Sequence, residues 1–490
     1  MNVNIPASYD LYAGGAWRKA ASTNVLECIS PITGARLTEV PDANAADIDM
    51  AVGHAAAAFP AWADVPAKKR QQLLGAVADR LVADAKRIAW LETANTGKPM
   101  RESLANVHTA ADRLRYYAGA CRALEGNLLP VSRDILSLEH RMPLGVVGII
   151  GAWNFPLNMF VGKIAPALAA GNTVVYKPAD WTPITTLEIA AIIGEILPPG
   201  VVNVVTGAGP TAGAALVAHP RVRMISMTGS SETGKRVMRD SAATLKRLTL
   251  ELGGKNAQIV LPDADLDRAA QGIMLGAFLN QGQVCTAGSR IFAHRSISAA
   301  LKAKVIALIP KLNMGDPFDD KTRMGTLIAK RHMEKVQSYI DIGEKEGARL
   351  LCGGGAAAVP GFDKALFMQP TLFDGGVTTM RIAQEEIFGP VALFFDWDDR
   401  ATMLQEVNGV EQGLAAGIWT SSLSEAHSLS RSVEAGRVWV NCFNLYPSGA
   451  SFGGTKGSGF GREDAFDTLM EFTETRNVVL DTAAAPRQFY

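Results

Sequence analysis

The chain has few cysteines and no surplus of charge of either sign, and each shortage excludes a class of protein. Its five cysteines are widely spaced and odd in number, so they predict no disulfide framework, and no metal site is evident from their spacing. Lysine and arginine number 48, as do aspartate and glutamate, which leaves no basic surplus to bind nucleic acid or an anionic membrane. We therefore expect a small-molecule ligand and a reducing, cytoplasmic environment.

We also expect no secretory signal and no membrane span. Residues 1–10 have neither the basic start nor the long apolar stretch of a secretory signal. The most apolar stretch, residues 143–162, is interrupted by Asn154, Pro156 and several glycines, which argues against a membrane span. Its β-branched start at 146–150 instead predicts a buried parallel strand that ends in a turn.

The length of 490 residues is too great for one compact core and predicts several domains with a cleft between them. Residues 45–95 carry apolar side chains at helical spacing. From residue 143 onward, short apolar runs alternate with amphipathic ones, which is typical of βαβ units around a parallel sheet. Strands are predicted at 173–176, 201–205 and 224–227, and helices at 185–197, at 211–218 and from about Ser230.

A second alternating region covers residues 256–439, and the glycine-rich residues 453–461 that follow predict a loop. Two further segments, residues 125–141 and 473–480, have the Ser, Leu, Thr and Val content of extended chain. We expect them to pair outside the main sheets, across a subunit interface.

Several motifs follow predicted strands. Lys177-Pro178-Ala179-Asp180 places a cation and an acid where open α/β sheets bind nucleotides, although a surface ion pair has the same pattern. Residues 207–212 match G-x-G-x-x-A, which an ordinary turn also explains. Residues 228–235 form a glycine-bounded loop opening a helix, suited to phosphate. Arg236 stands where a nucleoside triphosphatase needs Ser or Thr for magnesium, so a pyrophosphate without magnesium is the better ligand.

A carboxylate and a thiol stand in glycine-containing segments. Glu251 ends the strand-like run 248–250 and precedes two glycines. Cys285 lies in the polar turn 280–286, where it is either a reactive thiol or a small buried apolar side chain. Its nearest histidine in sequence is His294, which is too far along the chain to indicate a Cys-His pair.

Taken together, these motifs resemble those of the aldehyde dehydrogenase superfamily. The order and spacing of the motifs match across essentially the whole chain. The matching segments are residues 153–156 (Trp-Asn-Phe-Pro), 177–180, 229–234, 251–255, 282–285, 385–390 and 452–454. The resemblance implies an α/β fold with a Rossmann-like cofactor domain, an α/β catalytic domain and a small β oligomerisation extension. The implied boundaries are 1–121 with 143–253, then 254–456, and 122–142 with 470–490.

The resemblance also implies roles for the reactive residues. Cys285 looks like the nucleophile, Asn154 like a donor to the oxyanion, and Glu251 like the general base that hydrolyses a thioester. Glu251 argues against the branch of the family that transfers the acyl group to coenzyme A. Lys163 and Glu463 match a proton relay, and a structural ion pair is the alternative.

For the cofactor, the resemblance implies NAD, with NADP as the alternative. Asp180 replaces a usual Glu; its charge repels the extra phosphate of NADP, but its shorter side chain leaves more room. Glu386 looks like the acid on the nicotinamide ribose, with Phe388 beside the ring. The full cofactor set is Ala152, Trp153, Lys177, Asp180, Gly209, Gly229, Ser230, Gly234, Gly253, Glu386 and Phe388.

The substrate is expected to be an aldehyde whose identity the sequence leaves open. Gly162 replaces a large aromatic residue of many relatives, which predicts a wide pocket, and aromatic rings could hold an apolar or a cationic group. Residues 444–447 are faintly similar to amino- and betaine-aldehyde enzymes. The predicted lining is Phe155, Met159, Phe160, Gly162, Tyr446 and Phe452. We expect a homodimer or homotetramer, with residues 125–141 at the contact.

A binding protein that kept the fold and lost the activity is the non-enzymatic alternative, because fold alone does not establish function. That alternative predicts replacement of Cys285, Glu251 or Asn154, and all three are present.

Overall fold

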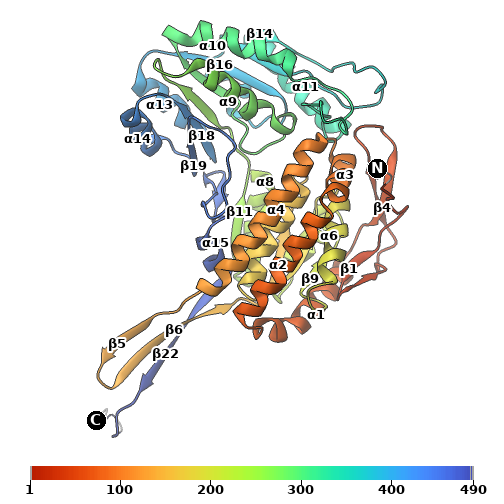
Figure 1. Ribbon diagram of the computed structural model, residues 1–490, viewed down its shortest axis with the longest axis vertical. Helices are drawn as coiled ribbons and strands as arrows, with labels where there is room; N and C mark the ends of the chain where they lie inside the picture. The colour runs from red at the N-terminus through yellow and green to blue at the C-terminus, as the bar shows by residue number, and fades with distance from the viewer. Residues whose placement is uncertain (1–2, 486, 488–490) are drawn as a thin grey trace.

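The computed structural model describes residues 3–485 and 487. It has an α/β architecture with two large sheets and a narrow three-stranded arm that projects from the body (Figure 1). The smaller of the two large sheets lies at the top of Figure 1, and the arm reaches down towards the C-terminus. The predicted fold class is confirmed.

The first sheet has eight strands in the order β2-β1-β9-β8-β7-β10-β11-β21, and those from β9 to β11 run parallel. Their bounds are β1 Leu11–Ala13, β2 Ala16–Arg18, β7 Val146–Ile150, β8 Thr173–Lys177, β9 Val202–Val204, β10 Val222–Thr228, β11 Arg247–Glu251 and β21 Gly459–Phe460. From β7 the chain builds the sheet towards β9, then crosses back and continues from β10 to β11. The order therefore reverses between β7 and β10, and such a reversal is where open α/β sheets bind ligands.

Helices cover this sheet, and their apolar faces form its largest buried cluster. Asn44 begins α1, since its side-chain oxygen accepts from the Asp47 N–H while Asp47 accepts from the Asn44 N–H at 3.0 Å. The predicted helical segment 45–95 is confirmed, divided at Pro66 and Asp84 into three helices. The helices are α1 Ala45–Ala63, α2 Ala67–Ala83, α3 Ala85–Thr96, α4 Met100–Ala120, α5 Pro156–Ala169, α6 Ile184–Gly194, α7 Ala214–Ala218 and α8 Ser231–Ser241.

The second sheet has seven strands in the order β14-β15-β16-β13-β12-β18-β19, all parallel to their neighbours except β14. The strands are β12 Ala257–Val260, β13 Arg290–His294, β14 Arg349–Cys352, β15 Thr371–Asp374, β16 Val391–Trp397, β18 Ala415–Trp419 and β19 Arg437–Val440. Its helices are α9 Leu266–Phe278, α10 Arg295–Leu308, α11 Lys330–Lys345, α12 Arg381–Gln384, α13 Arg400–Asn408 and α14 Leu423–Ser432.

The prediction that residues 453–461 form only a loop is wrong. Two short strands interrupt the segment: β20, Thr455–Lys456, pairs with β17, Gln412–Gly413, and β21 pairs antiparallel with β11. Gly459 has φ +102° and lies so close to β11 that a Cβ there would collide with the Leu250 carbonyl. The glycines therefore allow a close backbone approach that extends the first sheet.

The arm consists of β5 Leu128–Ser132, β6 Ile135–Pro143 and β22 Thr473–Asp481, preceded by α15 Phe466–Glu471. β22 pairs with β6 along its whole length within one chain, which confirms that the two extended segments pair outside the main sheets, while their place at a subunit interface stays a prediction. A separate hairpin joins β3 Val25–Ile29 and β4 Arg36–Pro41. The division into domains stays a prediction, and residues 1–2, 486 and 488–490 of it lie outside the described residues.

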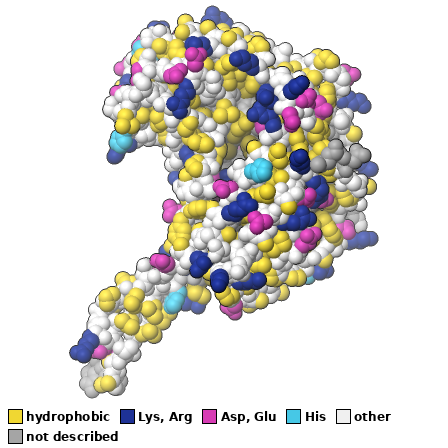
Figure 2. Space-filling view, in the orientation of Figure 1, with side chains coloured by type: hydrophobic (Ala, Val, Ile, Leu, Met, Phe, Trp, Pro, Cys, Tyr) yellow, Lys and Arg dark blue, Asp and Glu magenta, His cyan; other side chains and the backbone are white. Residues whose placement is uncertain are grey.

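The surface carries both signs of charge. Figure 2 shows acidic and basic side chains interspersed over the body and apolar side chains gathered on the arm. Val131 and Val479 on the arm are each 62% exposed. Within residues 3–485 and 487, no helix is both long and apolar enough to cross a membrane.

Candidate active site

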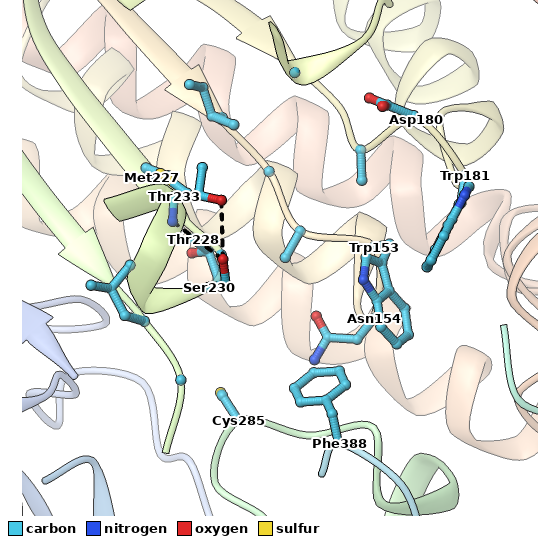
Figure 3. A pocket seen from close by; sticks show the side chains of 18 of the residues that line it. Trp153, Asn154, Asp180, Trp181, Met227, Thr228, Ser230, Thr233, Cys285 and Phe388 are labelled. Carbon is cyan, nitrogen blue, oxygen red and sulfur yellow. Dashed lines mark hydrogen bonds between the residues drawn. The ribbon is translucent and has the colours of Figure 1, made fainter. Parts of the chain in front are cut away.

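A cleft lies at the carboxyl ends of β7 and β10, where the order of the first sheet reverses. Its volume is 390 Å³, and it is lined by residues from the parts of the chain that form the first and the second large sheet. Asn154 and Phe388 face Cys285 across its lower part, and Ser230 and Asp180 lie on opposite sides of its upper part (Figure 3). The cleft therefore brings together motifs that are far apart in the sequence.

Cys285 lies in the loop between α9 and β13, at the edge of the second sheet that faces the first. The Asn256 side chain donates to the Cys285 carbonyl at 2.8 Å and to that of Ala287 at 3.0 Å. Removal from water raises the pKa of the Cys285 thiol, and the nearby acids Glu386 and Glu251 raise it further. The thiol is thus protonated at neutral pH and needs a base before it can act as a nucleophile.

Asn154 lies in the turn between β7 and α5 and is 3% exposed. Its side-chain amide donates one hydrogen bond, to the Gln283 carbonyl at 3.0 Å. Because an amide nitrogen has two N–H groups, one donor is left among the contacts of the described residues. This residue and Cys285 both line the cleft, so the donor is near the thiol.

Glu251 is the last residue of β11 and is 5% exposed. Neither carboxyl oxygen has a hydrogen-bond partner within the described part of the chain. One of these oxygens would lie 2.9 Å from a Cβ at Gly453, so the carboxyl group needs the glycine beside it. Burial raises the pKa of Glu251 well above its usual range, and Glu463 raises it further, while Lys163 opposes this.

Lys163 and Glu463 form an ion pair beside Glu251. Lys163, on α5, is 1% exposed and also donates to the Ser226 hydroxyl at 3.2 Å. The Thr249 hydroxyl donates to Ser226 at 2.8 Å, which continues the chain of polar groups onto β11. The structure thus brings the two predicted relay residues together next to the predicted base.

The upper part of the cleft carries the predicted nucleotide motifs. Lys177 Nζ donates to Asp180 at 2.7 Å and to the Pro178 carbonyl at 2.8 Å. Ser230 begins α8 and accepts from the Thr233 N–H at 3.3 Å. The predicted cofactor residues that line the cleft are Ala152, Trp153, Lys177, Asp180, Gly209, Gly229, Ser230, Gly253, Glu386 and Phe388.

Gly234 was predicted to bind the cofactor but does not line the cleft. It lies on the first turn of α8 and is buried, and a Cβ there would be 2.7 Å from the Leu252 side chain. The glycine therefore lets the helix approach the residue that follows β11.

The opposite wall is held by the segment around Glu386. The Gly254 N–H donates to the Glu386 carboxylate at 3.0 Å. Phe388 has φ +61° and packs edge-on against Trp153, with ring centroids 5.1 Å apart. His332 is within hydrogen-bond distance of the Phe388 carbonyl at 2.8 Å, which fixes this left-handed residue in place.

Residues that sequence reasoning missed complete this wall. Arg331, His332 and Lys335 come from α11, and Trp181 follows Asp180. The Arg331 guanidinium lies 4.2 Å from the Trp181 ring centroid. Burial lowers the pKa of His332 to about 4, so its ring is neutral. On α11 these residues have the pattern of any amphipathic helix, and no motif singled them out.

Two predicted substrate residues lie near the thiol. Tyr446 shares a hydrogen bond with the Thr286 hydroxyl at 2.7 Å, next to Cys285 in the chain. Its ring packs edge-on against Phe452 with centroids 5.5 Å apart. Phe155 and Met159 are partly exposed at the start of α5.

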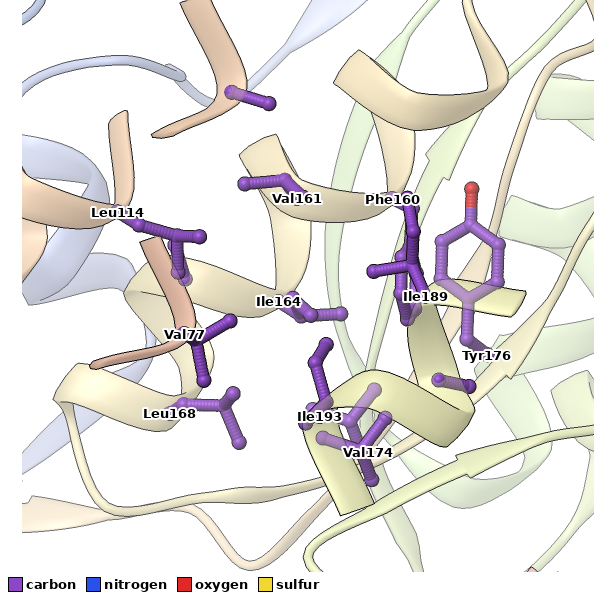
Figure 4. Close-up of a cluster of buried hydrophobic side chains, with 14 of the residues drawn as sticks. Val77, Leu114, Phe160, Val161, Ile164, Leu168, Val174, Tyr176, Ile189 and Ile193 are labelled. Carbon is purple, nitrogen blue, oxygen red and sulfur yellow. The ribbon is translucent and has the colours of Figure 1, made fainter. Parts of the chain in front are cut away.

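The structure contradicts the predicted substrate contact of Phe160, while that of Gly162 stays a prediction. Phe160 is fully buried and packs edge-on against Tyr176 with centroids 4.7 Å apart, because it faces the sheet from α5 (Figure 4). A Cβ at Gly162 would lie 3.2 Å from the Arg113 guanidinium, so this side chain takes up part of the space that the glycine leaves. Arg113, which pairs with Asp464 at 2.7 Å, lies in the space beside the glycine.

Comparison with known proteins agrees with this geometry. The sequence model of the aldehyde dehydrogenase family matches residues 17–478 of this chain. A putative aldehyde dehydrogenase from Burkholderia cenocepacia is 40% identical, with a TM-score of 0.97 over 98% of this chain and 99% of its own. The NAD+ complex of an aldehyde dehydrogenase from Bacillus cereus is 38% identical, with a TM-score of 0.95 over 98% of each chain.

A betaine aldehyde dehydrogenase mutant from Staphylococcus aureus, in complex with NAD+, is 33% identical, with a TM-score of 0.96 over 99% of this chain and 100% of its own. The family match and these three likenesses each extend over nearly the whole sequence. The chain belongs to the aldehyde dehydrogenase family.

Proposed function

We propose that this protein oxidises an aldehyde to the carboxylic acid with NAD+ and water, through a thioester on Cys285. The observation that carries the proposal is the buried carboxyl group of Glu251, which has no hydrogen-bond partner among the described residues and lies close enough to raise the pKa of the Cys285 thiol. A buried acid without a partner is costly, and such groups cluster at functional sites.

The cleft suits a dinucleotide. Its volume lies in the usual range for ligand sites. Gly209 lines it, and a Cβ there would meet nothing within 4 Å, so the chain leaves open space at this point. Lys177, Ser230 and Glu386 would hold the nucleotide, and NAD+ is present in relatives of this chain. When bound, the dinucleotide accepts at its nicotinamide ring the hydride that leaves the substrate carbon.

In the first half of the reaction, Glu251 takes the proton of the Cys285 thiol and the sulfur attacks the carbonyl carbon. A C–S bond forms and the carbonyl electrons move to oxygen. The free amide N–H of Asn154 and the Cys285 backbone N–H donate to that oxygen. Loss of hydride from the carbon then restores the carbonyl as a thioester.

In the second half, Glu251 has released the thiol proton and accepts a proton from the water that attacks the thioester. The C–S bond breaks, the acid leaves and the thiolate returns. Because Glu251 must release a proton in each turnover, a path to solvent is needed. We assign this path to Lys163 and Glu463, supported by their ion pair beside the base and by the partial exposure of Glu463. A purely structural ion pair is the alternative.

We propose an uncharged aliphatic or aromatic aldehyde as the substrate. The similarity of residues 444–447 to amino- and betaine-aldehyde enzymes would favour a cationic substrate, but Arg437 opposes this. Its guanidinium lies within 6.0 Å of the ring centroids of Trp439, Tyr446 and Phe452. A cationic substrate group on these rings would be repelled by this charge.

A panel of aldehydes assayed with NAD+ in H₂¹⁸O tests the reaction. We expect at least one ¹⁸O atom per newly formed carboxylate, measured by mass spectrometry of the product, and no dependence on coenzyme A. Within the panel, an uncharged aldehyde should have a higher kcat/KM than betaine aldehyde. Formation of an acyl-coenzyme A product would contradict hydrolysis.

The Asp180→Ser variant tests the preference for NAD+. Asp180 is paired with Lys177, so its removal takes away a negative charge and frees a cation for the 2′-phosphate of NADP+. We expect the ratio of kcat/KM for NAD+ over NADP+ to fall by about tenfold, which corresponds to about 1.4 kcal/mol. Asp240→Ser, at an exposed acid on α8, is the control. An unchanged ratio would mean that Asp180 does not face the ribose.

We also propose that the arm joins copies of this chain into a homodimer or homotetramer. Its exposed apolar side chains and unpaired strand edges are features that proteins cover. The exposed arm residues are Leu128, Leu129, Val131, Val479 and Leu480.

A charge placed on the arm should break the assembly. We expect Val131→Glu with Val479→Glu to lower the molar mass measured by light scattering after gel filtration to that of one chain. Leu423→Glu is the matched control, since Leu423 is 85% exposed on α14, away from the arm. An unchanged mass in the arm variant would contradict this interface.

A further inference from the structure

An ion pair lies beneath the turn that carries Asn154, and no step of the proposed reaction uses it. Lys98 and Glu92 are each 0% exposed, and their side chains meet at 2.9 Å. Glu92 comes from α3, and Lys98 lies between α3 and α4. An ion pair removed entirely from water is weak evidence for stability, because desolvation offsets much of the attraction. Its contacts therefore indicate what it does.

Both members hold the segment that follows β7. Lys98 Nζ donates to the backbone carbonyl of Asn154 at 2.8 Å and lies 4.3 Å from the centroid of the Phe155 ring. Glu92 accepts from the backbone N–H of Leu157 at 3.2 Å, on the first turn of α5. One ion pair thus contacts three residues of the segment 154–157, namely Asn154, Phe155 and Leu157.

The same carbonyl also links this turn to the loop of the thiol. The Asn280 side chain donates to the Asn154 carbonyl at 3.1 Å and to the Gln283 carbonyl at 3.3 Å. Gln283 in turn accepts from the Asn154 side-chain amide. The Asn154 backbone is therefore held by Lys98 from the segment between α3 and α4 and by Asn280 from the loop that carries Cys285.

We infer that Lys98, neutralised by Glu92, is a positioning residue that fixes Asn154 for its contact with the substrate oxygen. The inference rests on the proposed function, in which Asn154 is an oxyanion donor. Preorganised donors act only when they are held at the right place before charge develops. A shift of about 1 Å in such a group can slow a reaction by about a hundredfold.

The test uses the double variant Glu92→Gln with Lys98→Met. It leaves no buried charge without a partner, and the glutamine keeps an acceptor for the Leu157 N–H, so folding is preserved better than in Lys98→Met alone. Lys302→Met is the matched control, because Lys302 is 14% exposed, pairs with Asp374 at 2.7 Å and does not contact the turn. Thermal unfolding and NAD+ binding check that each variant is folded.

We expect the pre-steady-state burst of reduced cofactor to slow by about 10–100-fold in the double variant. The rate of Cys285 alkylation by iodoacetamide should stay unchanged, since that reaction needs no oxyanion donor. In an Asn154→Ala background the double variant should slow the burst by less than about twofold further, because Lys98 acts through Asn154. Lys302→Met should match the wild type in the burst and in the alkylation rate, and it should not slow the burst further in the Asn154→Ala background.

Equal slowing with and without Asn154, no slowing at all, or a parallel loss of alkylation would overturn the inference. If Asn154→Ala alone left the burst unchanged, the oxyanion assignment in the proposed function would fail first. The two failures are therefore distinguishable.

Discussion

Cys285→Ala is expected to reduce aldehyde oxidation by at least about 10³-fold while NAD+ binds with nearly the wild-type affinity. In the proposed reaction the sulfur forms the covalent bond to the substrate carbon, and alanine offers no nucleophile in its place. The residues proposed to hold the nucleotide, among them Lys177 and Ser230, come from other segments of the cleft wall. Steady-state turnover and titration of protein fluorescence with NAD+ measure the two effects.

Cys352→Ala is the matched control, because this cysteine is also partly exposed and lies on β14, outside the cleft. It should keep wild-type activity. Substantial turnover in Cys285→Ala would require another nucleophile and would remove the basis of the thioester mechanism.

Glu251→Gln is expected to separate the two halves of the reaction. Hydrolysis of the thioester should slow by about 10²–10⁴-fold, the usual contribution of general-base catalysis. If the thiol ionises without Glu251, the variant releases one equivalent of NADH per site and then stalls. If the burst is lost as well, Glu251 is needed first to form the thiolate. Stopped-flow absorbance distinguishes these outcomes, and full steady-state turnover would refute the assignment of the base.

The pH dependence supplies a second readout for the same residue. Burial raises the pKa of Glu251, and only the ionised carboxylate accepts a proton. Turnover should therefore fall as the pH falls through a value above the ordinary glutamate pKa of about 4.3. This acidic limb of the pH profile should be absent from Glu251→Gln. Glu471→Gln is the control, since this partly buried acid also has a raised pKa, of about 7, but accepts from the Arg462 backbone N–H and has no role in the proposed reaction. It should keep the limb.

The sequence was sufficient for elements defined by local pattern. Glu251 at the end of a β-strand, the break after residue 150 and the extended arm all follow from short runs of apolar residues and turn residues. Local pattern did not decide the role of Cys285, because a cysteine in a polar turn is either a reactive thiol or a small buried apolar side chain. Only the joint match of distant motifs favoured the reactive thiol.

Contacts between distant segments explain what could not be predicted. Arg113 lies beside Gly162 although the two belong to different helices, so an absent side chain did not mean an open space. Phe160 faces the core, whereas its neighbour Met159 is partly exposed. Which of two adjacent residues on α5 faces the core depends on how the helix is rotated against the sheet. The ion pair of Glu92 and Lys98 carries no motif of its own, and its relation to Asn154 appears only after folding.

The measurement that tests the covalent mechanism most directly is the mass of the peptide containing Cys285 after Glu251→Gln is mixed with aldehyde and NAD+. The account predicts an increase equal to the acyl group, present only when both reactants are added and absent from Cys285→Ala. An unmodified Cys285 peptide in a variant that has released its equivalent of NADH would contradict the thioester and with it the proposed route from aldehyde to acid.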